Sequence, residues 1–356
     1  MASKSLPETY KAVACTKPNT PWEIVDMPLR KPGPQEVLIR VHASGICYSD
    51  HLLKDGMWPG LQYPRIPGHE VIGRVADVGL TTQEAKGNEG RFKAGSLVAV
   101  GWNGGYCSRC DNCRKGEFWT CKNGNITGFT IDGGYGEYMY APETAVIHLD
   151  EDMLKENTYA ELAPLFCAGA TVFDAIRTSK WSPGDRCLIQ GIGGLGHLAV
   201  QYASKMGLVV YAVSSGSSKR DLALSLGASE YIDSSTTNVV EYMQSLGGAN
   251  LIICTAPNAN LISAILPAVA VNGMITLVSA ATDGEIKVSN LLLNMSRATL
   301  RGFACGCSPD SENCVKFSTR SKVKAMVQEF PIEEFDKAYQ GVIENTARFR
   351  NVIVFP

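Results

Sequence analysis

The sequence lacks an excess of charge of either sign. Its 356 residues carry 33 Lys and Arg against 35 Asp and Glu, which leaves a net charge of −2. A chain this close to neutral gives no electrostatic reason to expect nucleic acid or an anionic membrane as its main partner. Because 45% of the residues are hydrophobic, a disordered chain is excluded as well. The length predicts about two domains.

The sequence also lacks a secretory signal and an uninterrupted membrane span. Its first residues, MASKSLPETY, contain no apolar core of a signal peptide. Residues 251–282 carry no charge, but prolines, asparagines and a glycine interrupt them. Their β-rich ends, LIICTA and MITLVSA, flank a helix-like middle, which favours buried parallel strands around a helix. We therefore expect a cytoplasmic protein without a membrane partner.

Cysteine, by contrast, is abundant and unevenly distributed. Of 12 cysteines, four lie in the segment GGYCSRCDNCRKGEFWTCKNG, namely Cys107, Cys110, Cys113 and Cys121. In a reducing compartment thiols stay reduced, and four thiolates in one short loop can surround a zinc ion. Such a closed site leaves no position for substrate, so it predicts a structural zinc. An iron–sulfur cluster is the alternative, and the long gap before the last cysteine favours zinc.

A second set of candidate metal ligands is spread over three segments. These segments are GICYSDH at residues 45–51, PGHEVIG at 67–73 and APLFCAGAT at 163–171. They contain Cys47, His69 and Cys167, with Glu70 beside the histidine. Two cysteines and one histidine form the ligand set of a catalytic zinc with an open fourth position. Local spacing leaves open whether the three segments meet in space.

Residues 184–233 have the pattern of a nucleotide-binding unit. An apolar strand, CLIQ, is followed by the turn GIGGLG, a helical pattern and a second strand that ends at Ser214. Strand, glycine turn, helix and strand are the context that the G-x-G-x-x-G motif requires. The turn would hold a pyrophosphate at the helix N-terminus. Its residues are Gly191, Gly193, Gly194, Leu195 and Gly196.

The residues after the second strand indicate NADP(H) rather than NAD(H). A carboxylate at this point would hydrogen-bond to the adenosine ribose and select NAD. This chain instead has hydroxyls and cations, at Ser214, Ser215, Lys219 and Arg220. These groups suit a 2′-phosphate, and the nearest acid in the sequence, Asp221, falls in the next predicted helix. The alternative is that the two cations only form a solvated helix start.

Taken together, these motifs resemble the zinc-dependent medium-chain alcohol dehydrogenase family, and its NADP-linked, cinnamyl-alcohol-dehydrogenase-like branch. The resemblance covers nearly the whole chain. It implies an α/β protein with a GroES-like, mainly-β catalytic domain and a Rossmann domain built on a doubly wound parallel sheet, with the catalytic cleft between them. We expect the catalytic domain at residues 1–160, with the zinc lobe at about 104–124, and the Rossmann domain at 161–300. Residues 301–356 would return to complete the catalytic domain.

The resemblance also implies roles for single residues. Cys47, His69 and Cys167 would bind the catalytic zinc, and Glu70 would replace a zinc-bound water transiently. Asp50 would accept a hydrogen bond from His69. Further roles are implied for Ser49 at the substrate oxygen, Thr171 at the nicotinamide, Arg350 at the cofactor phosphates, and Tyr48, Trp58 and Trp102 in the substrate pocket.

One position departs from the family pattern. Many members have a proton-relay histidine five residues after the first zinc cysteine, where this chain has Leu52. His51 stands one residue earlier. Either His51 assumes the relay, or protons leave through water and Ser49.

The function implied is hydride transfer between NADP(H) and a primary alcohol or aldehyde, with two zinc ions per chain. The aromatic pocket residues suit an apolar or aromatic small-molecule substrate. We expect a homo-oligomer, a dimer or a tetramer. A zinc-free quinone or enoyl reductase of the same fold would lack Cys47, His69 and Cys167. A zinc- and NADPH-dependent reductase of an imine or a conjugated double bond remains the alternative.

Overall fold

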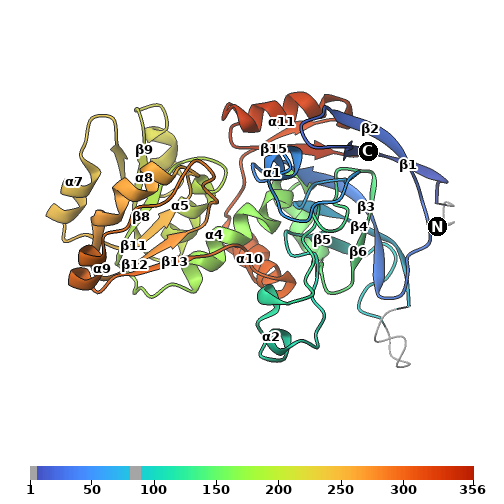
Figure 1. Cartoon of the computed structure of the whole chain (residues 1–356), viewed down its shortest axis with the longest axis horizontal. Helices are drawn as coiled ribbons and strands as arrows, with labels where there is room; N and C mark the ends of the chain where they lie inside the picture. The colour runs from blue at the N-terminus through green and yellow to red at the C-terminus, as the bar shows by residue number, and fades with distance from the viewer. Residues whose placement is uncertain (1–5, 81–89) are drawn as a thin grey trace. The chain divides into compact units, whose positions relative to one another are not determined.

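The computed structural model describes residues 6–80 and 90–356 and divides the chain into two compact units (Figure 1). The first comprises Met1–Cys167, Gly306–Thr319 and Ala325–Pro356, and the second Ala168–Cys305 and Arg320–Lys324. The first boundary therefore lies seven residues after the predicted end at residue 160, and Cys167 stays in the first unit. Residues 1–5 lie outside the described residues. They are the first half of MASKSLPETY, the segment in which the sequence analysis finds no signal peptide.

The first unit is built on a mixed sheet whose strands run in the order β14-β15-β3-β4-β5-β7, with β6 also paired to β3. A separate antiparallel pair is formed by β1 (Thr9–Cys15) and β2 (Trp22–Pro28). The other strands are β3 (Glu36–Gly45), β4 (Val71–Val78), β5 (Leu97–Val100), β6 (Tyr138–Pro142), β7 (Val146–His148), β14 (Val327–Phe330) and β15 (Arg350–Val354). The C-terminal strand β15 pairs with β3, so the end of the chain completes this sheet.

Helices of the first unit are short apart from two near the C-terminus. The short ones are α1 (Asp50–Lys54), α2 (Asp111–Arg114), η2 (Phe118–Thr120), η3 (Glu151–Lys155), α3 (Tyr159–Leu162), η4 (Ala163–Phe166) and η6 (Ile332–Glu334). The longer ones are α10 (Ser308–Ser321), whose last two residues fall in the second unit, and α11 (Phe335–Ile343). A capping box begins α3, because the Thr158 hydroxyl accepts from the Glu161 amide while the Glu161 carboxylate accepts from the Thr158 amide.

The second unit contains a parallel sheet in the strand order β10-β9-β8-β11-β12-β13. This order places β8 in the middle, with the chain moving outward first to one side and then to the other, as in a Rossmann fold. The strands are β8 (Arg186–Gln190), β9 (Val209–Ser214), β10 (Glu230–Asp233), β11 (Ala249–Cys254), β12 (Val269–Leu277) and β13 (Thr299–Gly302). The helices are α4 (Ala168–Arg177), α5 (Gly196–Lys205), α6 (Arg220–Ser225), α7 (Val239–Ser245), α8 (Ala259–Ile265), η5 (Leu266–Ala268) and α9 (Asn290–Ser296).

The uncharged stretch at residues 251–282 forms buried strands around a helix, as predicted. Its first end lies in β11 and its second in β12, with α8 between them. Leu251, Ile252 and Ile253 in β11 have no exposed surface, since parallel strands are covered on both faces. Within the described part of the chain, no single helix is long and apolar enough to span a membrane. One bent helix pair, Tyr159–Phe166 with Ala168–Arg177, passes that test by length and composition only.

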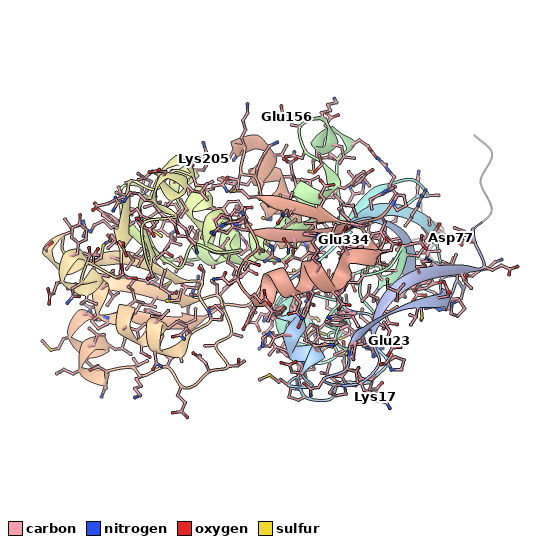
Figure 2. All side chains as sticks on the ribbon, turned by 90° about the horizontal axis from the view of Figure 1, so that it is seen from above. Lys17, Glu23, Asp77, Glu156, Lys205 and Glu334 are labelled. Atoms are coloured by element: carbon pink, nitrogen blue, oxygen red, sulfur yellow. The ribbon has the colours of Figure 1, made fainter. Side chains whose placement is uncertain are left out.

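Charged side chains of both signs lie on the surface, in keeping with the small net charge. Figure 2 shows five exposed examples, Lys17, Glu23, Glu156, Lys205 and Glu334.

The glycine turn lies between β8 and α5, where the sequence motif predicts it. Gly191 has a φ of +92°, in the left-handed region that favours glycine. A Cβ on Gly196 would lie 1.9 Å from the Gly191 carbonyl oxygen, so only glycine allows the helix to begin this close to the strand. A Cβ on Gly193 would meet nothing within 4 Å among the described residues.

We expect Gly196→Ala to lower the free energy of unfolding by roughly 2 kcal/mol, because its methyl group would overlap backbone that cannot move aside. Gly193→Ala is the matched control, with an expected change below roughly 0.5 kcal/mol. Urea unfolding followed by far-ultraviolet circular dichroism measures both. Equal stability of the two variants would contradict this account of the turn.

Candidate functional site

Four side chains that are distant in the sequence meet in the first unit. Cys47 lies just after β3, His69 and Glu70 just before β4, and Cys167 just after η4. One ligand atom from each of the four lies within 4.8 Å of the others. The structure therefore brings together the second predicted metal set. Every member of the set belongs to the first unit.

The spacing of these ligands fits a tetrahedral metal. The Cys47 and Cys167 sulfurs are 4.0 Å apart, and zinc–sulfur bonds of 2.3 Å in a tetrahedron separate two sulfurs by about 3.8 Å. The Ser49 hydroxyl donates to the Cys47 sulfur at 3.2 Å and lies 3.4 Å from His69 Nε2. The predicted proton-relay hydroxyl is thus part of the same group of atoms.

A buried carboxylate lies behind the imidazole. Asp50, the first residue of α1, is fully buried, and its Oδ1 lies 3.5 Å from His69 Nδ1. Its Oδ2 accepts a hydrogen bond from the Cys47 amide at 3.0 Å. Asp50 therefore faces Nδ1 of the imidazole, while the Ser49 hydroxyl lies beside Nε2. The predicted hydrogen bond from His69 to Asp50 stays a prediction.

Glu70 forms a buried ion pair with Arg350, the first residue of β15. The carboxylate is fully buried, and the arginine is 4% exposed. Burial raises the pKa of Glu70 to about 7, although the Arg350 charge opposes this increase. The structure thus gives Arg350 a protein partner that the sequence analysis did not identify. A contact between Arg350 and the cofactor phosphates stays a prediction.

The electrostatics of the group attract positive charge. Burial lowers the pKa of His69, but Asp50 and Cys47 overcome this effect and raise the value to about 10. The pKa of the Cys47 thiol falls well below 9, mainly through its contact with Cys167. A site that stabilises a thiolate and draws protons onto its imidazole also favours a divalent cation.

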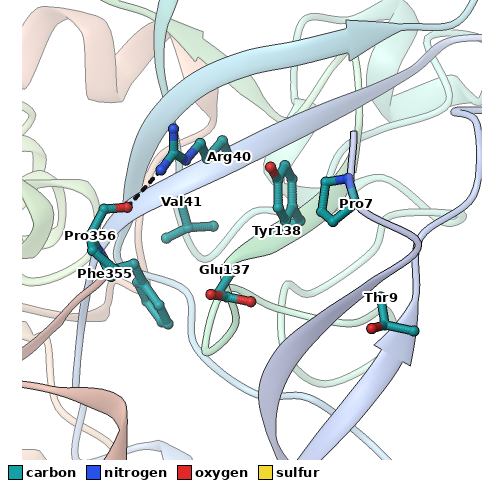
Figure 3. Close-up of a pocket in the computed structure, with 8 residues that line it drawn as sticks. All are labelled: Pro7, Thr9, Arg40, Val41, Glu137, Tyr138, Phe355 and Pro356. Carbon is teal, nitrogen blue, oxygen red and sulfur yellow. Dashed lines mark hydrogen bonds between the residues drawn. The ribbon is translucent and has the colours of Figure 1, made fainter. Parts of the chain in front are cut away.

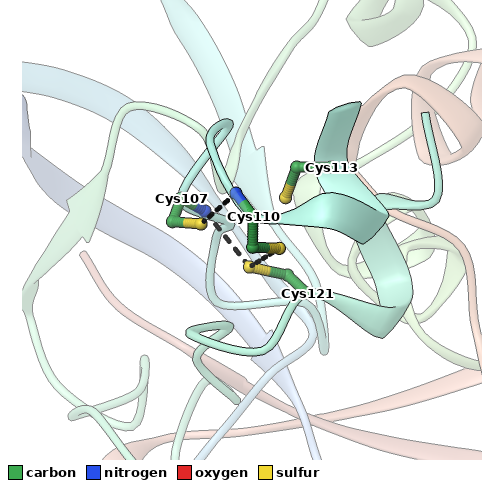
Figure 4. A group of neighbouring side chains, drawn as sticks. All are labelled: Cys107, Cys110, Cys113 and Cys121. Carbon is green, nitrogen blue, oxygen red and sulfur yellow. Dashed lines mark hydrogen bonds between the residues drawn. The ribbon is translucent and has the colours of Figure 1, made fainter. Parts of the chain in front are cut away.

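The four-cysteine lobe forms a second candidate metal site. Figure 4 shows Cys107, Cys110, Cys113 and Cys121 converging from the loop around α2, and their sulfurs lie within 4.8 Å of one another. The Cys110 and Cys121 sulfurs are 3.9 Å apart, again close to the tetrahedral spacing.

Amide groups of the lobe stabilise thiolates. The Cys107 amide donates to the Cys121 sulfur at 3.3 Å, and the Cys110 amide donates to the Cys107 sulfur at 3.4 Å. The Asn123 side chain also reaches Cys107, and with nearby backbone amides it lowers the pKa of that thiol to about 5. Burial raises the pKa of the Cys113 thiol to about 12, so the amides favour the thiolate at Cys107 and not at every cysteine. The spacing of the four sulfurs fits the predicted structural zinc.

Aromatic rings lie against the imidazole of the first metal group. The rings of Trp102 and His69 meet edge to face with centroids 4.7 Å apart. Trp58 packs 5.9 Å from Trp102, and Phe129 lies within 5.4 Å of both tryptophans. Of the three predicted pocket residues, Trp102 is thus adjacent to the site, and Trp58 lies behind it in the same ring cluster. Phe129 was not predicted, since an isolated phenylalanine gives no sequence signal.

The third predicted pocket residue and the relay candidate contact each other. Tyr48 is 41% exposed, and its ring lies 4.5 Å from that of His51. His51 Nδ1 donates to the Tyr48 carbonyl at 2.6 Å, since a carbonyl oxygen can only accept. Leu52 is buried. The relay role of His51 and the pocket role of Tyr48 stay predictions.

The predicted cofactor residues lie in the second unit, apart from Arg350. Thr171 is buried in α4, and the glycine turn precedes α5. Ser214 ends β9, Ser215 follows it, and Lys219 is the N-cap residue of α6.

One acid near this loop was missed because it comes from the neighbouring strand. Asp233, at the end of β10, pairs in register with Ser214 and accepts a hydrogen bond from the Gly216 amide at 2.8 Å. Its Oδ1 also accepts from the Ser235 amide and hydroxyl. Sequence proximity suggested Asp221 as the nearest acid, but strand pairing brings Asp233 to the loop.

A separate pocket of the first unit contains none of the predicted site residues. Figure 3 shows its lining, which is Pro7, Thr9, Arg40, Val41, Glu137, Tyr138, Phe355 and Pro356. Its volume is about 270 Å³, and Arg40 donates to the Pro356 carbonyl at 2.8 Å.

We expect Glu70→Gln to lower the free energy of unfolding at pH 8 by about 3–5 kcal/mol, since the buried Arg350 charge would lose its counter-charge. At this pH Glu70 is ionised, because its pKa is about 7. Glu151→Gln is the matched control. It breaks the more exposed pair with Arg74 and should cost about 1 kcal/mol or less. Urea unfolding measures both variants. Equal losses of unfolding free energy in Glu70→Gln and Glu151→Gln would contradict this account of the buried pair.

Comparison with known proteins supports the two-unit architecture. Residues 33–151 match the alcohol dehydrogenase GroES-like domain, and residues 194–320 match the zinc-binding dehydrogenase family. The alcohol dehydrogenase patD of Penicillium expansum is 37% identical over 353 residues, covering 99% of each chain. The alcohol dehydrogenase notN of Aspergillus sp. (strain MF297-2) is 35% identical over 350 residues, covering 98% of this chain and 99% of the relative.

Solved structures agree with this result. CAD from Helicobacter pylori, complexed with NADP(H), superposes with a TM-score of 0.84 at 27% identity, covering 97% of this chain and 98% of that chain. A cinnamyl alcohol dehydrogenase from Sorghum bicolor superposes with a TM-score of 0.85 at 27% identity, covering 97% of each chain. The predicted fold class, GroES-like plus Rossmann, is confirmed. The chain therefore belongs to the zinc-type medium-chain alcohol dehydrogenase family, in its cinnamyl-alcohol-dehydrogenase-like branch.

Proposed function

We propose that this protein is a zinc-dependent alcohol dehydrogenase, or aldehyde reductase, that transfers a hydride between NADP(H) and a primary alcohol or aldehyde. The observation that carries the proposal is the contrast between the two metal groups. The lobe offers four thiolates, which close a tetrahedron. The buried group offers Cys47, His69 and Cys167, with Glu70 paired to Arg350, which leaves a coordination position for substrate.

The residues around the buried group have distinct tasks in this proposal. Cys47, His69 and Cys167 hold the metal, and Asp50 orients the imidazole from behind. Ser49, whose hydroxyl lies beside Cys47 and His69, passes a proton to or from the substrate oxygen. When bound, zinc supplies Lewis acidity at that oxygen and the nicotinamide cofactor supplies or accepts the hydride. A proton path that continues from Ser49 through His51 stays a prediction.

The preference for NADP(H) rests on the loop after β9. Ser215 is exposed, and the loop also contains Ser217, Ser218 and Lys219, whose hydroxyls and cation suit a 2′-phosphate. Asp233 Oδ1 accepts hydrogen bonds from the Gly216 and Ser235 amides, and these bonds hold the loop in shape. The complex of the Helicobacter pylori relative with NADP(H) also supports this preference.

The preference for an apolar or aromatic substrate rests on the rings beside His69. Trp58, Trp102 and Phe129 form one cluster next to the metal group. A wall of aromatic rings favours substrates with apolar surface, and a polar sugar-like substrate would leave its hydroxyls without partners there.

A cytoplasmic location and a homo-oligomeric assembly stay predictions.

The first test is the metal content of the purified protein together with its turnover of candidate substrates. We expect two zinc ions per chain, one for each candidate group, and NADPH-dependent reduction of apolar aldehydes. Elemental analysis and NADPH oxidation against aldehyde, imine and enone panels measure these outcomes. One zinc ion that is lost in Cys110→Ser, with no second site, would overturn the catalytic-metal assignment. Turnover of imines or enones alone would favour the alternative reductase.

A single carboxylate should reverse the cofactor preference. We expect Ser215→Asp to lower kcat/KM for NADPH by about 10–100-fold, because the new charge repels the 2′-phosphate and removes a charge-assisted hydrogen bond. The kcat/KM for NADH should rise. Ser225→Asp adds the same charge at the exposed end of α6 and serves as the control. Initial rates with both cofactors measure this change. Parallel losses of kcat/KM for NADPH and NADH would argue against a role of the loop after β9 in selecting NADP(H).

A further inference from the structure

A tyrosine hydroxyl in the core of the first unit points at the carboxylate behind His69. Tyr135 is fully buried, and its hydroxyl donates to Asp50 Oδ2 at 2.5 Å. It also lies 3.2 Å from the Gly45 carbonyl oxygen. Asp50 Oδ2 therefore has two donors, Tyr135 and the Cys47 amide, while Oδ1 remains directed at the imidazole.

The position of Tyr135 is fixed by the chain that carries the metal ligand. The Tyr135 amide donates to the Pro67 carbonyl at 3.0 Å, and the Gly134 amide donates to the Gly68 carbonyl at 2.9 Å. The Tyr135 ring packs so closely on Gly68 that a Cβ there would lie 2.6 Å from Cδ1. Phe335 of α11 supports the ring from another side, with centroids 4.8 Å apart. The ring is thus held beside the residue that precedes His69.

We propose that Tyr135 is a positioning residue for the catalytic metal site. Its hydroxyl holds the Asp50 carboxylate in the one orientation that directs Oδ1 to His69 Nδ1. This orientation sets the imidazole so that Nε2 lies beside the Ser49 hydroxyl, which itself contacts the Cys47 sulfur. The same carboxylate holds the Cys47 amide, so one tyrosine acts on two of the three ligands. The inference rests on the proposed metal at Cys47, His69 and Cys167.

The hydroxyl is suited to this task because it stays protonated. Burial, and then the Asp50 charge, raise the pKa of Tyr135 well above 10. A hydroxyl that keeps its proton remains a donor to the carboxylate throughout the neutral pH range. The hydroxyl contributes little to packing, since phenylalanine at this position would keep every ring contact. Its removal therefore isolates the hydrogen bond.

The test compares metal retention by the wild-type holoenzyme and by Tyr135→Phe. Zinc release to a chelator is followed with a colorimetric zinc indicator, and the two sites are separated by their release phases. We expect the phase of the buried group to become about tenfold faster in Tyr135→Phe, at the lower end of the effect of outer partners of metal ligands. The phase of the four-cysteine lobe should not change, because Tyr135 contacts Asp50, Gly45 and Phe335, which lie outside that loop. Cys110→Ser, which weakens only the lobe, assigns the phases.

Two further variants distinguish positioning from a general structural role. Tyr10→Phe removes a hydroxyl from another buried tyrosine of the same core and should change neither phase. In an Asp50→Ala background, Tyr135→Phe should accelerate release no further, because its effect passes through Asp50. Unchanged release from the buried group in Tyr135→Phe would overturn the inference and leave the proposed function intact. A wild-type protein with no metal in the buried group would overturn both the inference and the proposed function. Faster release from both sites in Tyr135→Phe would show a general loss of structure, and this would overturn the inference alone.

Discussion

The first unit depends on placing several ionisable groups in a core that excludes water. Asp50, His69 and Glu70 have no exposed surface, and an isolated charge in such a place is strongly unfavourable. Each charge therefore needs a partner from another part of the chain. Arg350 comes from β15, and it reaches Glu70 because Val352 pairs with Gly45 of β3. The C-terminal return of the chain to the first sheet thus supplies the counter-charge of the site.

The sequence predicted what is encoded at short range. Four cysteines within one loop and the G-x-G-x-x-G turn are patterns whose chemistry follows from local spacing. The missed partners depend on chain segments that only folding brings together. Tyr135 and Asp50 are 85 residues apart in sequence, Arg350 and Glu70 are 280 apart, and Asp233 reaches Gly216 from a neighbouring strand. Tyrosine, aspartate and arginine are common residues, so no local pattern marks these pairs.

The first domain boundary also depends on contacts that local sequence patterns do not reveal. Residues 159–166 are mostly apolar and helical, and nothing in their composition separates them from the helix that follows. The structure assigns α3 and η4 to the first unit because both pack against β3 and β4. This assignment matters for the site, since Cys167 directly follows η4. A boundary at residue 160 would have separated Cys167 from the other ligands.

The two metal groups differ in how much of the fold each requires. In the lobe, donors and ligands lie within residues 107–123, so a short loop and a metal can organise each other. In the buried group, the ligands come from three segments, and Asp50, Tyr135 and Arg350 must also be in place. Ordering this group therefore requires the first sheet to be formed. Metal binding there should stabilise the whole unit by linkage, whereas metal in the lobe stabilises mainly its own loop.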